Sequence, residues 1–202
     1  ITLDDSDDAN FEKASVAFPS TFISEEASGD HHLTFYTRQS YTAYGPISLC
    51  LTGDPYAEEE CSVEGNKLSS SSSGPLQISS VTEEISHVGS NAITLRLSIE
   101  GEFVGGDTAQ LVQLEQTYES TCLLENKDET TSTEVSLILF GESYNCGTMT
   151  FALGEDHATA SCKIENMDTQ LFIGGQKEYG GWIRIDYGYQ EIQSLAFTVA
   201  NE

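Results

Sequence analysis

The chain has very little positive charge. Its 202 residues include only 8 Lys and Arg against 33 Asp and Glu, which gives a formal net charge of -25. Proteins bind nucleic acids and anionic lipids mainly through Lys and Arg that neutralise phosphate, so this surface repels both partners. We therefore expect no nucleic-acid partner. The acidity predicts a strongly hydrated surface, and binding of divalent cations or basic partners is the open alternative.

A long hydrophobic run is also missing. The longest apolar stretch, residues 135–140, contains a serine, whereas a membrane helix needs roughly 20 apolar residues. We therefore expect no membrane insertion.

The chain starts at Ile1 and has no charged and then apolar leader. We interpret it as the processed form of an extracellular protein, secreted or on the cell surface, with a trimmed chain as the alternative.

Motifs of enzyme active sites are absent as well. The sequence has no Gly-x-Ser-x-Gly elbow, no Gly-rich phosphate loop and no Cys/His group at zinc spacing. His31 and His32 are adjacent, so in a strand they point to opposite faces and cannot bind one metal. We expect a protein that is not an enzyme and needs no cofactor, with calcium as the one alternative.

The calcium alternative depends on the acidic start of the chain. Four aspartates form a weak candidate metal site there: Asp4, Asp5, Asp7 and Asp8. An EF-hand loop that begins at Asp4 requires Gly where Ala9 stands and Glu where Ser15 stands. A solvated acidic arm is therefore the preferred interpretation.

Five cysteines are present without a Cys-x-x-Cys pair, which favours disulfides over metal binding. Cys50 and Cys61 are the preferred pair, because their disulfide closes a short loop and contributes roughly 3 kcal/mol. Cys122, Cys146 or Cys162 supply a second pair, so the candidate disulfide residues are Cys50, Cys61, Cys122 and Cys146. Cys162 is expected to be the buried thiol that remains.

The clearest pattern in the sequence is an alternation of apolar and polar residues over 91–100. Its apolar members are Ile93, Leu95, Leu97 and Ile99. A period of two residues is that of a β-strand with one buried face. The pattern recurs in weaker form between Gly, Ser, Asp and Asn turns. It predicts an all-β fold, an antiparallel β-sandwich or jelly roll of about ten to twelve short strands with at most one or two short helices, in a single domain over 1–202.

Two stretches carry more specific expectations. One short helix is predicted from apolar residues at helical spacing and a capping box, namely Val81, Ile85 and Val88 with Ser80 and Glu83. Residues 135–140 are predicted to form a strand that is buried on both faces, because Ile138 and Phe140 are apolar as well.

Aromatic residues and an apolar segment are the candidates for function. The candidate sugar-stacking residues are Tyr36, Tyr41, Tyr44, Trp182 and Tyr187. The alternative for the tyrosines is cross-strand packing, and for Trp182 a core position. The candidate assembly segment lies in an N-terminal arm, residues 1–23, and consists of Val16, Phe18, Phe22 and Ile23. Pro19 interrupts this segment, which restricts it to a sheet edge or a bend.

Two functions of different classes follow. The first is a non-enzymatic extracellular structural protein, a subunit of a filament, fibre or coat that forms a homopolymer by β-strand addition between copies of itself. The alternative is a carbohydrate-binding, lectin-like recognition module whose partners are glycans, with or without calcium.

Overall fold

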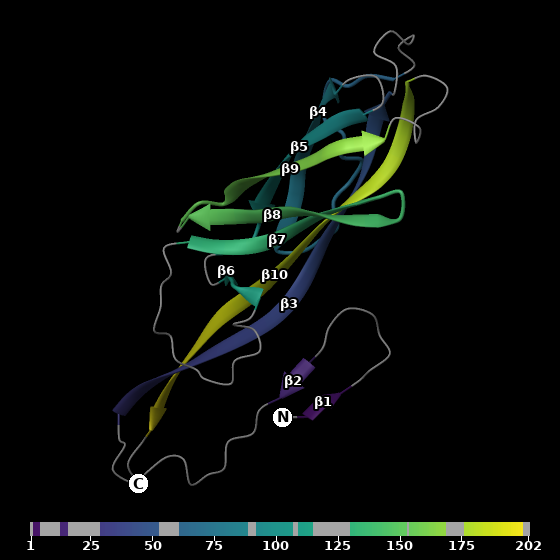
Figure 1. The fold of residues 1–202 in the computed structure, drawn as a ribbon. Coiled ribbons are helices and arrows are strands. Elements are labelled where there is room, and N and C mark those ends of the chain that lie inside the picture. The colour runs from purple at the N-terminus through teal and green to yellow at the C-terminus, as the bar shows by residue number, and fades with distance from the viewer. Residues whose placement is uncertain are drawn as a thin grey trace. The chain divides into compact units, whose positions relative to one another are not determined.

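The structure is a computed structural model. It describes residues 2–4, 13–15, 29–52, 61–88, 92–106, 109–114, 130–152, 154–168 and 176–199. Within these residues the fold is almost entirely antiparallel β-structure and contains no α-helix (Figure 1). The predicted all-β class is confirmed. The chain divides into two compact units, residues 1–34 with 194–202 and residues 35–193, and the single domain stays a prediction.

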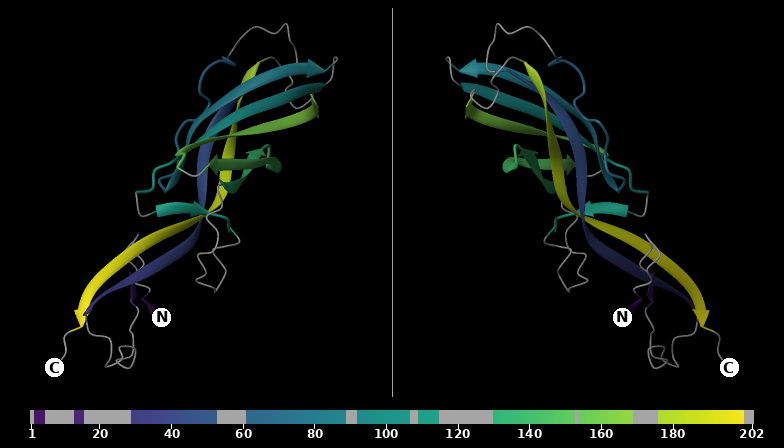
Figure 2. Two further views of the ribbon diagram at one scale, coloured as in Figure 1. Left: turned by 90° about the vertical axis from the view of Figure 1, so that its left-hand side faces the viewer. Right: turned by 90° about the vertical axis from the view of Figure 1, so that its right-hand side faces the viewer.

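Two sheets form the larger unit. The first has the strand order β3 (Gly29–Leu51), β10 (Lys177–Val199), β7 (Thr130–Leu139) and β8 (Glu142–Ala152), and β6 (Ala109–Val112) also pairs with β10. The second has the order β4 (Leu76–Val88), β5 (Ala92–Phe103) and β9 (His157–Asp168). Figure 2 shows these last three strands next to one another in both side views. Strands β3 and β10, of 23 residues each, take part in both units.

Strand β5 is the centre of the second sheet. It pairs with β4 on one side and with β9 on the other. The four aliphatic residues of its alternating pattern are all buried and belong to one hydrophobic core that both sheets share: Ile93, Leu95, Leu97 and Ile99. Leu49, Leu137 and Ile183 are core members from the first sheet. Burial of each such side chain contributes about 1.5–3 kcal/mol, so this shared core is what holds the two sheets together.

The predicted helix at Val81 is wrong, because the segment lies within strand β4. Val81 and Glu83 are both buried, at alternate positions of the strand. A carboxylate at a core position hides the apolar alternation. The register shift between Ile78 and Ser80 hides it further, because a bulge changes which residues face the core.

Residues 135–140 form a strand with only one buried face. Val135, Leu137 and Leu139 are buried, whereas Ile138 is only half-buried. Phe140 is exposed and lies in the turn to β8 with a φ of 54°. The expectation of two buried faces is therefore wrong, and Ile138 belongs to the outer face of the first sheet.

The described residues of the smaller unit lie in four strand segments. β1 (Thr2–Asp4) pairs with β2 (Lys13–Ser15) in an antiparallel two-stranded sheet. The beginning of β3 contacts the end of β10: Thr198 donates a hydrogen bond to Asp30 over 2.8 Å, and the ring of His31 stacks on Phe197. These contacts show that β3 and β10 run antiparallel there.

Candidate functional site

The outer edge of β3 is partly closed by residues 61–72, called here the closing segment. β3 stands at one end of the strand order, with β10 on its inner side. The closing segment hydrogen bonds to backbone groups on the other side of β3 over 2.8–3.0 Å, pairing Tyr44 with Ser72, Pro46 with Ser69, and Ser48 with Lys67. Even-numbered residues of β3 therefore direct their backbone groups away from β10.

Pro46 fits this arrangement. A proline has no backbone N–H, so within a sheet it is tolerated where that group would point outward from an edge. The closing segment reaches β3 only from Tyr44 onward. Among the described strands, none pairs with the outer edge of β3 before Tyr44, although β3 begins at Gly29. This earlier part of the edge is the first candidate interaction site.

The closing segment also binds the edge of the second sheet. Lys67 donates its backbone N–H to the carbonyl of Val81 over 2.7 Å, and Val81 donates to the side-chain oxygen of Asn66 over 3.0 Å. Leu68 forms an isolated antiparallel bridge with Ile47 of β3. The segment therefore links β3 to β4 and covers one side of the core.

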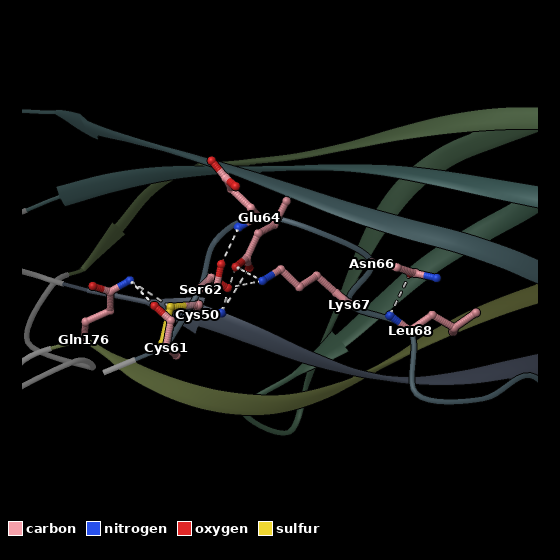
Figure 3. A network of polar contacts seen from close by, with 9 residues as sticks. Cys50, Cys61, Ser62, Glu64, Asn66, Lys67, Leu68 and Gln176 are labelled. Atoms are coloured by element: carbon pink, nitrogen blue, oxygen red, sulfur yellow. Dashed lines mark hydrogen bonds and ion pairs between the residues drawn. A yellow bond between two sulfur atoms is a disulfide. The ribbon is translucent and has the colours of Figure 1, made fainter. Parts of the chain in front are cut away.

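A buried ion pair holds this link in place (Figure 3). Lys67 Nζ lies 3.0 Å from Glu83 Oε1, and the two side chains are 7% and 0% exposed. The Glu83 carboxylate also accepts the backbone N–H of Cys50, at 2.9 and 3.1 Å. The Lys67 ammonium donates to the carbonyl of Ser62. Burial raises the pKa of Glu83, and the hydrogen bond from Cys50 and the charge of Lys67 oppose that effect only in part.

Cys50 and Cys61, the pair expected from loop closure, form a disulfide at the same place. Gln176 is buried beside it and donates to the Cys50 sulfur at 2.9 Å and to the Cys61 carbonyl at 3.0 Å. Figure 3 shows these groups converging on the start of the closing segment. The polar groups of this cluster hydrogen bond to one another, and its two cysteines are joined in a disulfide. The cluster therefore anchors the closing segment and presents no reactive group.

A second disulfide joins Cys146 of β8 to Cys162 of β9, which are strands of different sheets. Cys162 is therefore not the leftover thiol, and that expectation is corrected; Cys122 lies outside the described residues. A register shift between β7 and β8 falls at Cys146 and Gly147, where Gly147 has a φ of 82°. This bulge changes the direction of the Cys146 side chain, which reaches the other sheet. Two intramolecular disulfides are typical of extracellular proteins.

The outer face of the first sheet is the second candidate site. Trp182 of β10 is 49% exposed and Tyr44 of β3 is 40% exposed. Thr42 of β3 donates to Asp186 of β10 over 2.7 Å, which places these even-numbered residues of both strands on one face. Arg184 lies between Trp182 and Asp186 on β10 and forms an ion pair with Asp186 at 3.0 Å.

A depression lies beside these residues on the same face. It is lined by residues of β7, β8 and β10: Glu134, Val135, Ser136, Ser143, Asn145 and Asp186. Cross-strand pairing explains the grouping, because Asp186 pairs with Glu134 and Ile138 pairs with both Trp182 and Ser143. The depression therefore lies on the same face as the exposed tryptophan, and most of its lining is polar.

The predicted sugar-stacking residues separate into two groups. Trp182 and Tyr44 are exposed on the outer face, and the core alternative for Trp182 is wrong. Tyr187 is only 1% exposed, and burial raises its pKa to about 12, so it cannot stack on a ligand. Tyr41 stacks on Tyr187 with ring centroids 5.8 Å apart and meets Tyr189 edge to face. Tyr36 is half-buried in β3.

Several predicted residues lie where the structure gives no side-chain description. Val16, Phe18, Phe22 and Ile23 of the assembly segment, and Asp5, Asp7 and Asp8 of the acidic arm, lie outside the described residues. Asp4 lies in β1, whose backbone alone is described.

Among the described residues, no group of three or more His, Cys, Asp or Glu is placed to hold a metal. In the same part of the chain, no helix is long and apolar enough to cross a membrane.

Sequence reasoning missed the Lys67–Glu83 pair and the polar depression. A signal for the pair was present, because Glu83 stands two residues from Val81 and two from Ile85, at a core position of a strand. The depression had no such signal, because its residues come from three strands whose register the sequence does not show.

No family model, curated protein or solved structure matches this chain.

Proposed function

We propose that this protein is a non-enzymatic, extracellular structural subunit, a β-sandwich that forms a filament, fibre or coat by β-strand addition between copies. The observation that carries the proposal is the edge of β3. The closing segment occupies that edge from Tyr44 to Ser48, and no other described strand pairs with the rest of it. A stretch of sheet edge with which no described strand pairs is a template for a strand from another chain.

The segment that adds to this edge is the arm of a neighbouring copy, residues 1–23. It carries the apolar residues Val16, Phe18, Phe22 and Ile23. Burial of each of these side chains contributes about 1.5–3 kcal/mol. Ordering the segment opposes this gain, and new backbone hydrogen bonds along the edge favour the bound state.

The acceptor edge has an apolar surface beside it. Tyr41 of β3 is 37% exposed and packs on the rings of Tyr187 and Tyr189 of β10. An incoming strand at the outer edge of β3 would place its side chains next to Tyr41. After Glu191 no described strand pairs with the other side of β10, and a two-stranded ribbon is only marginally stable in water, so a third strand would stabilise this part of the β3–β10 pair.

Deletion of residues 1–23 is expected to abolish polymers and leave soluble monomers, because it removes the donor strand. Negative-stain electron microscopy and size-exclusion chromatography at matched concentrations measure this. A synthetic peptide of residues 1–23 should bind the deleted protein in a 1:1 ratio. The control variant lacks only residues 1–10 and should still polymerise, because the apolar segment is kept. Unchanged polymers after the full deletion would refute the mechanism.

The acceptor edge can be tested in the full chain with Ser40→Pro. Ser40 is an even-numbered residue of β3, so its N–H points away from β10, as at Pro46. The substitution should therefore keep the fold, verified by circular dichroism, and should block addition of a strand. Ser40→Ala is the matched control and should assemble normally. A folded Ser40→Pro protein that polymerises as the wild type does would exclude this edge as the acceptor.

A further inference from the structure

The outer face of the first sheet has features that strand addition does not use. Trp182, the only tryptophan in the chain, presents 49% of its surface to solvent. A partner that covers a large exposed aromatic ring gains hydrophobic stabilisation. Tyr44 stands on the same face, one strand away. The two rings offer apolar surfaces on the same face as the polar depression.

The polar groups of the depression are held in fixed positions. Asp186 accepts hydrogen bonds from Thr42 at 2.7 Å and from Arg184 at 3.1 Å. Asn145 accepts the backbone N–H of Gly147 at 2.7 Å, within the bulge of β8. That bond occupies the side-chain oxygen of Asn145 and leaves its NH2 group to donate. A ligand therefore meets oriented donors and acceptors, which lowers the entropy lost on binding.

The chemistry of this face selects among ligands. Carboxylates of Glu134 and Asp186 and the hydroxyls of Ser136 and Ser143 hydrogen bond to hydroxyl groups of a ligand. The guanidinium of Arg184 is already paired with Asp186. With a net charge of -25, the protein repels anionic ligands. A neutral molecule with an apolar face and many hydroxyls fits best, and a pyranose ring has both properties.

We infer that the outer face of the first sheet binds a neutral oligosaccharide, with one pyranose ring stacked on Trp182 and the hydroxyls of neighbouring sugar units bonded to the polar depression on the same face. Tyr44 provides a second ring for the next sugar along the chain. This site lies on the face of the sheet, whereas strand addition uses the edge of β3. The two activities are therefore independent, and a filament with this face exposed would bind glycans at many positions.

Trp182 itself reports on binding, since no other tryptophan contributes to the fluorescence. The probes are neutral β-1,4-linked and α-1,4-linked glucose and mannose hexasaccharides, added to the full chain, with oligogalacturonate as the anionic comparison. At least one neutral hexasaccharide should shift the emission to shorter wavelength with a saturable dependence on concentration, and calorimetry should give the same affinity. Failure of every neutral probe, or binding of the anionic probe alone, would overturn the inference.

Substitutions on this face test whether the sugar ring stacks on Trp182 or binds elsewhere on the protein. Trp182→Ala should weaken binding in calorimetry at least tenfold, whereas Trp182→Phe keeps a ring and should lose much less. Asn145→Ala should weaken binding about fivefold to tenfold, as expected for one lost hydrogen bond. Val104→Ala is the control, because Val104 is an exposed apolar residue outside this face. Binding by Trp182→Ala equal to that of Val104→Ala would place the ligand elsewhere and refute the site.

Discussion

Glu83→Ala is expected to lower the free energy of unfolding by about 3–5 kcal/mol, the usual effect of removing one partner of a buried ion pair. The substitution leaves the Lys67 ammonium buried and without its carboxylate, at a side chain that is 7% exposed. It also removes the acceptor of the Cys50 N–H. Urea denaturation followed by circular dichroism measures the change.

The neighbouring residue provides a matched control. Glu84 pairs with Arg96 at 3.9 Å, and both of these side chains are more than half exposed. Glu84→Ala should therefore change stability by less than about 1 kcal/mol. The double variant Lys67→Met with Glu83→Gln should recover most of the loss, because no unpaired charge remains and the Gln oxygen still accepts from Cys50. Equal effects of Glu83→Ala and Glu84→Ala would show that the pair does not anchor the closing segment.

The same pair has a pH dependence of known sign. Burial raises the pKa of Glu83 above its ordinary value of 4.5. At pH values below the unfolded-state pKa of Glu83, the stabilisation that this residue gives to the folded state is therefore complete. It is lost as the pH rises through the higher folded-state pKa. The stability of the wild type relative to Glu83→Gln should therefore decrease as the pH rises above the ordinary Glu pKa of 4.5.

Replacing Cys146 and Cys162 together by alanine is expected to lower the free energy of unfolding by about 3 kcal/mol. The disulfide closes a loop of sequence separation 16, and its loss gives the unfolded chain more conformational freedom. It also removes the covalent link between β8 and β9. Guanidinium denaturation without reductant measures the change.

Ser161→Ala is the control for this pair. Ser161 is exposed and lies next to Cys162 on β9, so its replacement should change stability by less than about 0.5 kcal/mol. A double cysteine variant as stable as Ser161→Ala would mean that shared core packing alone joins the two sheets.

The sequence predicts most strands because one face of each is apolar. The alternation at Ile93 to Ile99 identifies β5 directly, and the expected Cys50–Cys61 pair needs only short loop closure. The second half of β4 is predicted as a helix from the spacing of its apolar residues and a capping box that includes Glu83, whereas Glu83 occupies a core position of the strand. That position is stable only through Lys67 and Cys50, which a local pattern does not reveal.

The candidate sites depend on register, which local sequence does not encode. Trp182 and Tyr44 were identified as aromatic candidates, but their common face depends on the pairing of β3 with β10. Tyr187 is also a sugar-stacking candidate, but it is buried on the face that it shares with Ile183 and Ile185. The Cys146–Cys162 disulfide requires the bulge at Gly147, and the sequence shows only a glycine there.

Backbone hydrogen exchange along β3 tests strand addition most directly. Even-numbered residues such as Tyr36, Ser40 and Thr42 direct their amides to the outer edge, as Tyr44 and Ser48 do. Upon addition of the 1–23 peptide to the deleted protein, exchange measured by NMR should slow at Tyr36, Ser40 and Thr42 and remain unchanged at the odd-numbered residues between them. Alternating protection is a direct sign of a new antiparallel or parallel neighbour. Bound peptide without slower exchange at these even-numbered amides would contradict assembly at this edge.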